Sequence, residues 1–160
     1  MSQESPMSTP PGPAPRLSDF PSVAREKLRY GDTDRQGHVN NAVFATFLET
    51  GRVEMLFNNG VDLMGPNGAF VLARLLLDYR NEVNWPGEVE IGTRVAGFGR
   101  SSLRFEQGVF QNGECVATAQ TVVVLTDTTT RRSKPFSDEA RAFLQECQGV
   151  SASAPVAGLG

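Results

Sequence analysis

The chain has 160 residues, a formal net charge of −3 and a sequence pI of about 5.2, and 39% of its residues are hydrophobic. This composition is typical of one globular domain and shows neither the clustered Lys/Arg surplus of a nucleic-acid binder nor an apolar run near the ~18 residues of a membrane span. The N-terminus lacks the charged and apolar regions of a secretory signal. The two cysteines, Cys115 and Cys147, have no close spacing, which favours free thiols in a reducing compartment and predicts a cytoplasmic location.

The one histidine, His38, narrows the chemistry that the chain can perform. Zinc sites combine ligands at short, recognisable spacings, whereas this sequence offers only His38, scattered carboxylates and two distant cysteines. A Ser-His-Asp hydrolase of the G-x-S-x-G type needs a serine on that elbow, and the sequence contains none. We therefore expect no metal and no bound cofactor.

Both ends of the chain have compositions that disfavour a packed core. Six of the ten prolines fall in residues 1–22, and residues 149–160 are rich in Ser, Ala and Gly. Such segments bury too little apolar surface to offset their ordering entropy. We expect a disordered Pro-rich tail over 1–22, one folded domain over 23–148, and a flexible C-terminal tail over 149–160.

The first half of the folded part is expected to contain a short strand over residues 23–30 and a loop over 31–37. A one-sided helix is predicted over 41–58 because apolar side chains recur there at helical spacing. Asn40 is expected to cap this helix and Gly60 to end it. The apolar stripe consists of Phe44, Phe47, Leu48, Met55 and Leu56, with the small Gly51 on the same side.

The second half changes to the period of strands. Residues 69–79 are rich in Leu, Val and Phe, which predicts a strand buried on both faces. Asn112-Gly113 predicts a hairpin turn, and a short helix is expected over 137–145. This order predicts an α+β domain in which a curved antiparallel sheet wraps one long helix. The remaining strands are expected over 89–95, 103–109 and 114–126.

The segment that leads into the long helix is the one that carries chemistry. A helix N-terminus has unpaired N–H groups and a partial positive charge, so it can stabilise a carbonyl oxygen that becomes negative during a reaction. Asp34, a few residues upstream, is placed to attack that carbonyl or to activate a water beside it. Asp and Asn before a helix also serve as turn and cap residues, so this pattern by itself leaves a purely structural role open.

Fixed positions at fixed spacing give the segment a family resemblance. It resembles the 4-hydroxybenzoyl-CoA thioesterase-like family, and in particular acyl-CoA thioesterases with the signature D-x-D-x-x-x-H-V-N-N followed by aromatic positions and E-x-x-R. The likeness covers roughly residues 23 to 146. Phe44 and Phe47 depart from it, because many relatives carry tyrosine there. The matching residues are Asp32, Thr33, Asp34, Gly37, His38, Val39, Asn40, Asn41, Ala42, Glu49 and Arg52, and a weaker likeness extends through Asp78-Tyr79, Gly87-Glu88, Gly99-Arg100-Ser101-Ser102 and the final strand.

The resemblance implies a hotdog fold and assembly as homodimers or homotetramers, with active sites between subunits. It implies that Asp34 is the nucleophile or the general base, and that the backbone N–H of Asn41 polarises the thioester carbonyl. The acyl group would lie along the helix against apolar side chains. The further substrate-binding positions that it suggests are Gly37, His38, Glu49, Arg100 and Ser101.

Several of these residues have two possible roles. His38 either bonds to the catalytic carboxylate, to water or to substrate, or it is structural in the loop. Asp32 either shares the active site or, as we mainly expect, shapes the loop. Glu49 and Arg52 are three residues apart on the helix and can pair, but Glu49 can instead orient the loop or the substrate.

Two further segments have compositions that are found at nucleotide- or phosphate-binding sites. Arg131, Arg132 and Lys134 form a small basic cluster that is either a solvated loop or a contact for the phosphates of coenzyme A. The run from Gly97 to Ser102 superficially matches a dinucleotide-binding fingerprint. It lies between two predicted strands rather than before a helix, so a hairpin bend is the better interpretation.

We therefore expect an acyl-CoA thioesterase that converts an acyl-coenzyme A thioester into a carboxylic acid and free coenzyme A. Its expected partners are the acyl-CoA substrate and further copies of the chain, without nucleic acid or membrane. The alternatives are a thioesterase acting on acyl carrier protein and a hotdog module that binds acyl-CoA without hydrolysing it. The sequence leaves open the acyl preference, dimer against tetramer, and the choice between nucleophile and base for Asp34.

Overall fold

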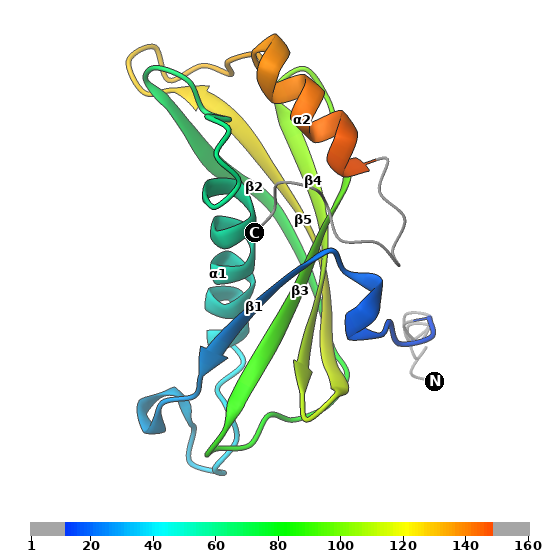
Figure 1. The fold of residues 1–160 in the computed structure, drawn as a ribbon. Helices are drawn as coiled ribbons and strands as arrows, with labels where there is room; N and C mark the ends of the chain where they lie inside the picture. The colour runs from blue at the N-terminus through cyan, green and yellow to red at the C-terminus, as the bar shows by residue number, and fades with distance from the viewer. Residues whose placement is uncertain (1–11, 149–160) are drawn as a thin grey trace, which may run out of the picture.

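Five strands and one long helix make up most of the computed structural model, which describes residues 12–148 (Figure 1). The strands form an antiparallel sheet in the order β1-β3-β4-β5-β2, so β1 and β2 are the edge strands. The elements are η1 (Leu17–Asp19), β1 (Ser22–Lys27), η2 (Tyr30–Asp32), α1 (Val43–Phe57), β2 (Gly68–Tyr79), β3 (Glu88–Phe98), β4 (Ser102–Gln111), β5 (Glu114–Asp127) and α2 (Asp138–Gln148).

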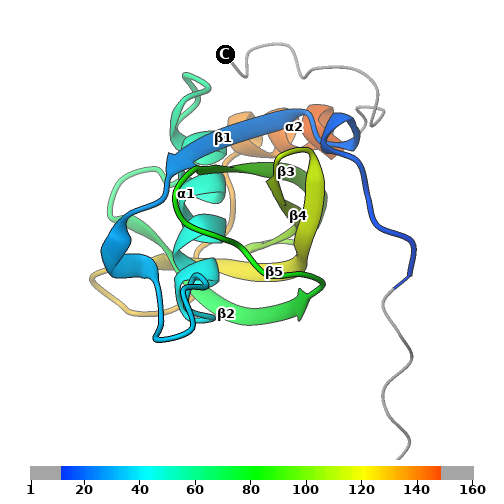
Figure 2. The same cartoon turned by 90° about the horizontal axis from the view of Figure 1, so that it is seen from below.

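The sheet is strongly curved and surrounds the central helix. Seen from below, it curls round α1, with β1 on one side of the helix and β2 on the other (Figure 2). The register shifts in β2 between Leu72 and Arg74 and in β3 between Val95 and Gly97. Such irregularities bend a strand and increase its twist. The predicted α+β architecture, a curved antiparallel sheet around one long helix, is confirmed.

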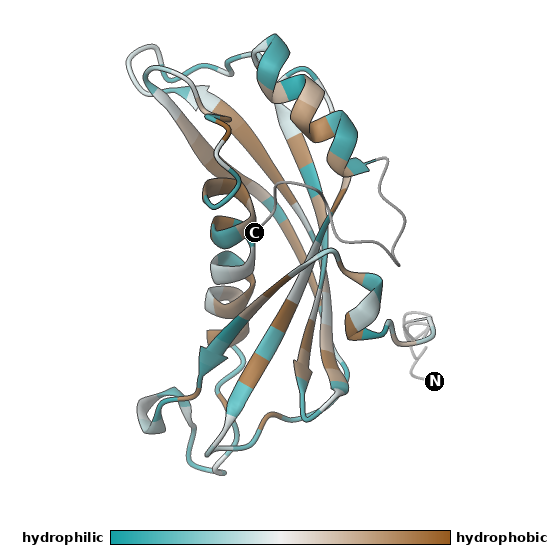
Figure 3. Ribbon diagram, viewed as in Figure 1, coloured by the Kyte–Doolittle hydropathy of each residue, from teal (hydrophilic) through white to brown (hydrophobic). Residues whose placement is uncertain are grey.

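The core lies between the inner face of the sheet and α1. Side chains along the strands alternate between hydrophobic and hydrophilic, which is visible as bands of colour in Figure 3. Full burial of a Val, Leu, Ile or Phe side chain contributes about 1.5–3 kcal/mol, so this layer supplies most of the driving force for folding. The sheet buries Val89, Ile91, Val95, Leu103, Phe105 and Val109, and α1 buries Phe44, Phe47, Leu48, Met55 and Leu56.

Gly51 allows α1 to approach the sheet closely. A Cβ atom at this position would lie 2.7 Å from Cγ2 of Ile91 and 2.8 Å from Oγ1 of Thr93. Any side chain would therefore push the helix off β3. The small residue that the sequence shows on the apolar stripe is required by this contact.

The turn and the last helix also follow the predictions. Asn112 and Gly113 have φ values of 52° and 81°, as a tight hairpin turn requires. The hydroxyl of Ser137 accepts the N–H of Ala140 at 3.1 Å and caps α2, which ends at Gln148, three residues later than expected. The buried residues of α2, Ala140, Leu144 and Cys147, belong to the same core cluster as the C-terminal half of α1.

The burial predicted for residues 69–79 is wrong for the subunit on its own. These residues form β2, but β2 is an edge strand and leaves much of its apolar surface uncovered. Val71 and Leu72 are each 51% exposed, and Leu76 is 42% exposed. An apolar run predicts that a strand will be buried, but it does not identify the molecule that buries it.

The N-terminal boundary also differs from the expectation of a disordered tail over 1–22. Phe20 is buried on the outer face of the sheet, where a Cβ atom at Gly92 would lie 2.4 Å from its ring. The turn η1 precedes it, and β1 already begins at Ser22. Contacts with the sheet, of which the buried Phe20 ring is one, therefore order part of a proline-rich segment that composition alone assigns to disorder. Residues 1–11 and the tail expected over 149–160 lie outside the described residues.

Candidate active site

The short turn η2 fixes the start of the loop between β1 and α1. The backbone N–H of Arg29 donates to Oδ2 of Asp32 at 2.9 Å, and the Arg29 guanidinium donates to Oδ1 at 3.3 Å. Asp32 is only 7% exposed, and its carbonyl accepts the N–H of Asn40 at 2.8 Å. These contacts hold the two ends of the loop together. Asp32 thus shapes the loop, as predicted.

Asp34 lies in a tight turn that is closed by its own side chain. Its Oδ1 accepts the N–H of Gln36 at 2.8 Å and the N–H of His38 at 3.3 Å. Gly37 completes the turn with a φ of 82°, in the left-handed region that favours glycine. Asp34 is exposed, and within residues 12–148 no hydrogen-bond partner is found for its Oδ2. One carboxylate oxygen is therefore fixed while the other is left for a ligand or water.

The imidazole of His38 contacts Glu82 rather than Asp34. Its Nε2 lies 3.0 Å from Oε2 of Glu82, on the segment that follows β2. The N–H of the next residue, Val39, donates to the carbonyl of Val83 at 2.8 Å. His38 therefore joins the loop to that segment, and only its backbone N–H reaches the carboxylate of Asp34.

The start of α1 leaves one backbone donor free. Asn40 was predicted to be the N-cap of α1, but the N-cap is Ala42, because the helix begins only at Val43, three residues after Asn40. Asn40 still serves the helix end: its Oδ1 accepts the N–H of Ala42 at 3.1 Å, and its carbonyl accepts the N–H of Val43 at 3.0 Å. No acceptor is found for the N–H of Asn41 in the part of the chain that the structure describes. That N–H lies at the positive end of the helix dipole.

A cleft of about 640 Å³ brings these groups together. Asp34, His38 and Asn41 line it, together with Phe44 and Tyr79. The motif in the sequence predicted that the first three lie near one another. Tyr79 is the last residue of β2, and Glu82, in the segment after it, also lines the cleft. Neither was identified as a site residue, because only the strand order places this end of β2 beside the loop.

Glu49 lies at a different cavity, of about 330 Å³, along the C-terminal half of α1. Its side chain is exposed at the mouth, whereas Arg52 is only 8% exposed. Within one subunit Glu49 therefore does not contact the cleft that holds Asp34. The apolar lining consists of Val53, Leu56, Phe57, Met64, Ala69, Phe70, Leu72 and Val123.

Arg52 turns into the core instead of pairing directly with Glu49. Its guanidinium donates to Oε1 of Gln107 at 3.2 Å, and Gln107 Nε2 donates to Oγ1 of Thr93 and to the carbonyl of Leu48, both at 2.9 Å. Burial lowers the pKa of Arg52, and the nearby charge of Glu49 partly opposes this. The pairing expected from the i, i+3 spacing is thus replaced by a buried polar network that joins α1 to the sheet.

The other predicted substrate contacts lie at the opposite end of the sheet from Asp34. Tyr79 pairs with Ala117 and Gly68 pairs with Asp127, so the two ends of β2 are about 35 Å apart. The Asp34 loop lies at one end, and the segment after β5 lies at the other (Figure 1). At that far end are Arg100 and Ser101 in the β3–β4 hairpin, and Arg131, Arg132 and Lys134 after β5.

Lys134 has a structural role at this far end. Its ammonium donates to the carbonyl of Met64 at 3.0 Å and to the carbonyl of Pro66. These bonds tie the segment after β5 to the loop before β2. Arg131 and Arg132 are exposed and, among the described residues, their guanidinium groups have no recorded acceptor. Of the predicted phosphate contacts, the two arginines are therefore the more available.

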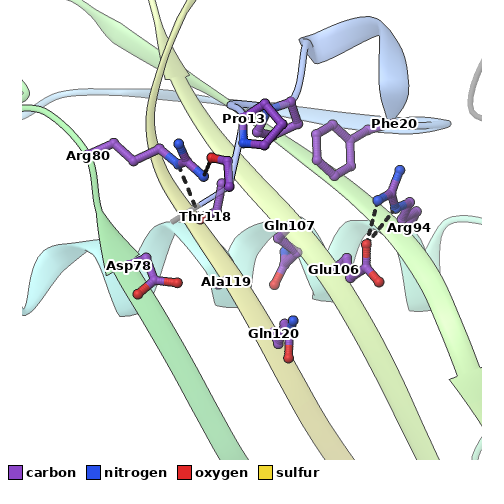
Figure 4. A pocket seen from close by; sticks show the side chains of 12 residues that line it. Pro13, Phe20, Asp78, Arg80, Arg94, Glu106, Gln107, Thr118, Ala119 and Gln120 are labelled. Atoms are coloured by element: carbon purple, nitrogen blue, oxygen red, sulfur yellow. Dashed lines mark hydrogen bonds and ion pairs between the residues drawn. The ribbon is translucent and has the colours of Figure 1, made fainter. Parts of the chain in front are cut away.

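A third cavity, also about 330 Å³, lies on the outer face of the sheet under the N-terminal segment (Figure 4). Arg80 holds that segment, because its guanidinium donates to the carbonyl of Gly12 at 2.9 Å. Arg94 pairs with Glu106 and stacks over Phe20 at 5.3 Å from the ring centroid. The charges of this cavity are largely engaged in holding the segment to the sheet.

Metal ligands, membrane-spanning helices and disulfides are the remaining features that bear on function. Within residues 12–148, no group of three or more His, Cys, Asp and Glu side chains is placed to hold a metal ion. None of the helices in this range has the length and hydrophobicity needed to cross a membrane. Cys115 and Cys147 are both free and buried.

Comparison with known proteins places these features in a family. The family model of the Thioesterase-like superfamily matches residues 28–144. A 1,4-dihydroxy-2-naphthoyl-CoA hydrolase from Synechococcus elongatus is 25% identical over 123 residues, which cover 74% of this chain and 90% of that protein. A thioesterase from Thermus thermophilus, solved with coenzyme A and Zn, is 35% identical with a TM-score of 0.72, over 82% of this chain and 97% of that one. The PA5185 protein from Pseudomonas aeruginosa has a TM-score of 0.75 and 27% identity, over 87% and 99% of the two chains.

The matched segment includes all the features that define the site. It runs from the end of β1 through the Asp34 loop, α1 and the remaining strands into α2. The solved relatives share the sheet and its central helix over nearly their whole length. The chain therefore belongs to the Thioesterase-like superfamily, as an acyl-CoA thioesterase-like enzyme with the hotdog fold.

Proposed function

We propose that the protein hydrolyses an acyl-coenzyme A thioester to a carboxylic acid and free coenzyme A in the cleft that holds Asp34. The observation that carries this proposal is that one cleft is lined by the exposed carboxylate of Asp34 and by Asn41, whose N–H has no acceptor within residues 12–148. The thioester carbonyl would accept that N–H, and the charge that develops on its oxygen would be stabilised at the positive end of α1. Membership of the thioesterase family supports the substrate class.

Two chemical roles for Asp34 agree with its geometry. As a general base, the carboxylate takes a proton from a water molecule that adds to the carbonyl carbon, and the intermediate then expels the thiolate of coenzyme A. As a nucleophile, it adds to the carbonyl, expels the thiolate and forms an anhydride that water later cleaves. The free Oδ2 suits both roles. Hydroxylamine separates them when the protein itself is analysed: attack on the aspartyl carbonyl of an anhydride leaves a hydroxamate on Asp34, which the general-base route cannot form, whereas free acyl hydroxamate also arises directly from the thioester.

We further propose that the protein assembles through the open edge of β2. This strand has 12 residues, and Val71, Leu72 and Leu76 are exposed along it. Val53 and Phe57 on the adjacent surface of α1 are 45% and 52% exposed. A long apolar edge promotes aggregation unless it is covered, and a second copy paired β2 to β2 around a two-fold axis would cover it. Light scattering in solution distinguishes a dimer from a tetramer.

Such pairing would complete the cleft with residues of the partner subunit. Because paired β2 strands would run antiparallel, the Tyr79 end of one would lie beside the Gly68 end of the other. The far end that carries Arg100, Ser101, Arg131 and Arg132 would then approach the Asp34 cleft of the neighbouring subunit, and the cavity beside Glu49 would lie next to it. We propose that the phosphates of coenzyme A contact the partner's Arg131 and Arg132, and that the acyl group lies between the two α1 helices.

The identity of the acyl group, and of the carrier to which it is attached, has to be determined by experiment. The Synechococcus relative is a hydrolase of an aromatic acyl-CoA, but 25% identity does not transfer that substrate to this chain. The two buried, free cysteines support the proposed cytoplasmic location, where thiols stay reduced. Because both thiols are buried, they should react slowly with the reagent of a colorimetric thiol assay and add little to its background.

The test is thiol release by the wild-type protein from aromatic, medium-chain and long-chain acyl-CoAs, and from acyl groups on acyl carrier protein. We expect turnover of at least one acyl-CoA class, and the preferred class names the substrate. If only acyl groups on acyl carrier protein are hydrolysed, the substrate is acyl carrier protein rather than acyl-coenzyme A. Tight acyl-CoA binding without thiol release from any substrate would contradict the hydrolase and favour a binding module.

A further inference from the structure

Tyr79, at the end of β2, is bonded to the residue that supplies the free N–H. Its hydroxyl donates to the carbonyl of Asn41 at 2.8 Å. Its ring meets that of Phe44 edge to face, with the centroids 5.1 Å apart and an interplanar angle of 79°. Tyr79 is 48% exposed and lines the same cleft as Asp34. A strand far away in the sequence thus reaches the oxyanion end of the helix.

The hydroxyl of Tyr79 fixes a peptide that the helix itself holds poorly. The only helical bond to the Asn41 carbonyl comes from the N–H of Phe44 and is long, at 3.4 Å. The other end of the same peptide, the N–H of Ala42, is held by Oδ1 of Asn40 at 3.1 Å. Tyr79 and Asn40 therefore hold the peptide between residues 41 and 42 from both sides.

We propose that Tyr79 is a positioning residue for the oxyanion donor. The N–H of Asn41 belongs to the preceding peptide, whose carbonyl accepts the N–H of Val43 at 3.0 Å. The bond from Tyr79 adds a second restraint on the direction of this N–H, because it limits the rotation about Asn41. Phe44 and Phe47 bring no hydroxyl to this region of the helix, so the chain relies on the phenol of the facing strand. The proposal rests on the proposed function, because it requires Asn41 N–H to bind the thioester oxygen.

The experiment compares Tyr79→Phe with Tyr30→Phe. Tyr30 is the only other tyrosine; it is 74% exposed and contacts Trp85 edge to face without a recorded bond to its hydroxyl in the described chain. We expect Tyr79→Phe to lower kcat about 3- to 10-fold, the range of one neutral hydrogen bond, with KM changed less than about twofold. The amide NMR signals of Asn41 and Ala42 should shift in this variant and stay in place in Tyr30→Phe.

The outcomes separate this proposal from the function on which it depends. If the wild type cleaves thioesters and Tyr79→Phe keeps its kcat, the positioning role is refuted while the function stands. A raised KM with unchanged kcat would also overturn it, because the hydroxyl would then bind substrate. If the wild type cleaves no thioester, the proposed function is refuted. The catalytic role of Tyr79 is then refuted as well, even if the amide signals of Asn41 and Ala42 shift in Tyr79→Phe.

Discussion

The N–H of His38 donates to the carboxylate of Asp34 at 3.3 Å, while the imidazole of the same residue turns away to Glu82 at 3.0 Å. The turn thus holds Asp34 through its backbone and not through the histidine ring. In this arrangement His38 orders the loop, and its imidazole does not contact the carboxylate of Asp34. The proposed catalysis therefore requires the carboxylate of Asp34, the N–H of Asn41 and the groups that fix them.

Replacing His38 by Gln tests this division of roles. We expect kcat to stay within about tenfold of the wild type, because a general acid or base contributes typically 10²–10⁴-fold and His38 is not placed as one. The partly exposed pair with Glu82 is worth at most about 1 kcal/mol, so thermal stability should change little, and Glu82→Gln should behave in the same way. A loss of more than about 100-fold in kcat for His38→Gln alone would assign the imidazole a direct role.

Gly37 tests the importance of the turn around Asp34. A residue with a Cβ atom is strained at its φ of 82°, by about 1–3 kcal/mol, although the space around it is open. We expect Gly37→Ala to lower kcat about 10- to 100-fold because the carboxylate is displaced. Gly31→Ala is the matched control, since a Cβ atom there also meets open space and its φ is not in the left-handed region. Equal activity of the two variants would show that the turn does not set the position of Asp34.

The thiol of Cys147 reports on the packing of α2. Burial raises its pKa to about 11, and the charge of Glu146 adds to this. Because the folded-state pKa is raised, the stability linked to this thiol is present below about pH 9 and is lost as the pH rises toward 11. At pH 9 we expect iodoacetamide to label Cys147 at least about tenfold more slowly in the folded than in the unfolded protein, as followed by peptide mapping. Fast labelling of the folded protein would mean that α2 does not cover the thiol.

Mixing of inactive subunits tests the shared active site. One variant is Asp34→Asn, and the other is the double variant Arg131→Ala with Arg132→Ala. If the arginines serve the cleft of the partner, a mixed dimer contains one site with all its groups intact, and co-expression should restore activity at acyl-CoA concentrations below KM. If the arginines serve the cleft of their own subunit, or no cleft, mixing restores nothing beyond the average of the two variants.

Much of the fold could be predicted from the sequence, because hydrophobic periodicity and turn residues are local signals. Helix α1 begins and ends within two residues of the prediction, and Asn112-Gly113 makes the expected hairpin. The Asp34 motif was equally accessible, since its members are close along the chain and lie in one cleft.

Other features depend on contacts between distant segments, which no local pattern records. Tyr79 reaches Asn41 across 38 positions, and the weak family likeness at Asp78-Tyr79 assigns it no role in the site. Lys134 appeared to be a phosphate ligand because the sequence does not show the carbonyl of Met64 that its ammonium binds. For β2, the apolar composition predicted burial, but the strand is exposed in the single subunit. Its composition fits a surface that only a further chain would bury.

The most direct test compares Asp34→Asn with Asp62→Asn in the thiol-release assay. Asp62 is the matched control: it is also exposed, and its Oδ1 also accepts two backbone N–H groups, those of Met64 at 3.2 Å and Gly65 at 3.0 Å, but it lies outside the cleft. Asn preserves the acceptor oxygen in both turns and removes only the charge. We predict a loss of at least about 100-fold in kcat for Asp34→Asn and activity close to that of the wild type for Asp62→Asn. Full activity of Asp34→Asn, or an equal loss in both variants, would contradict a catalytic carboxylate at this position.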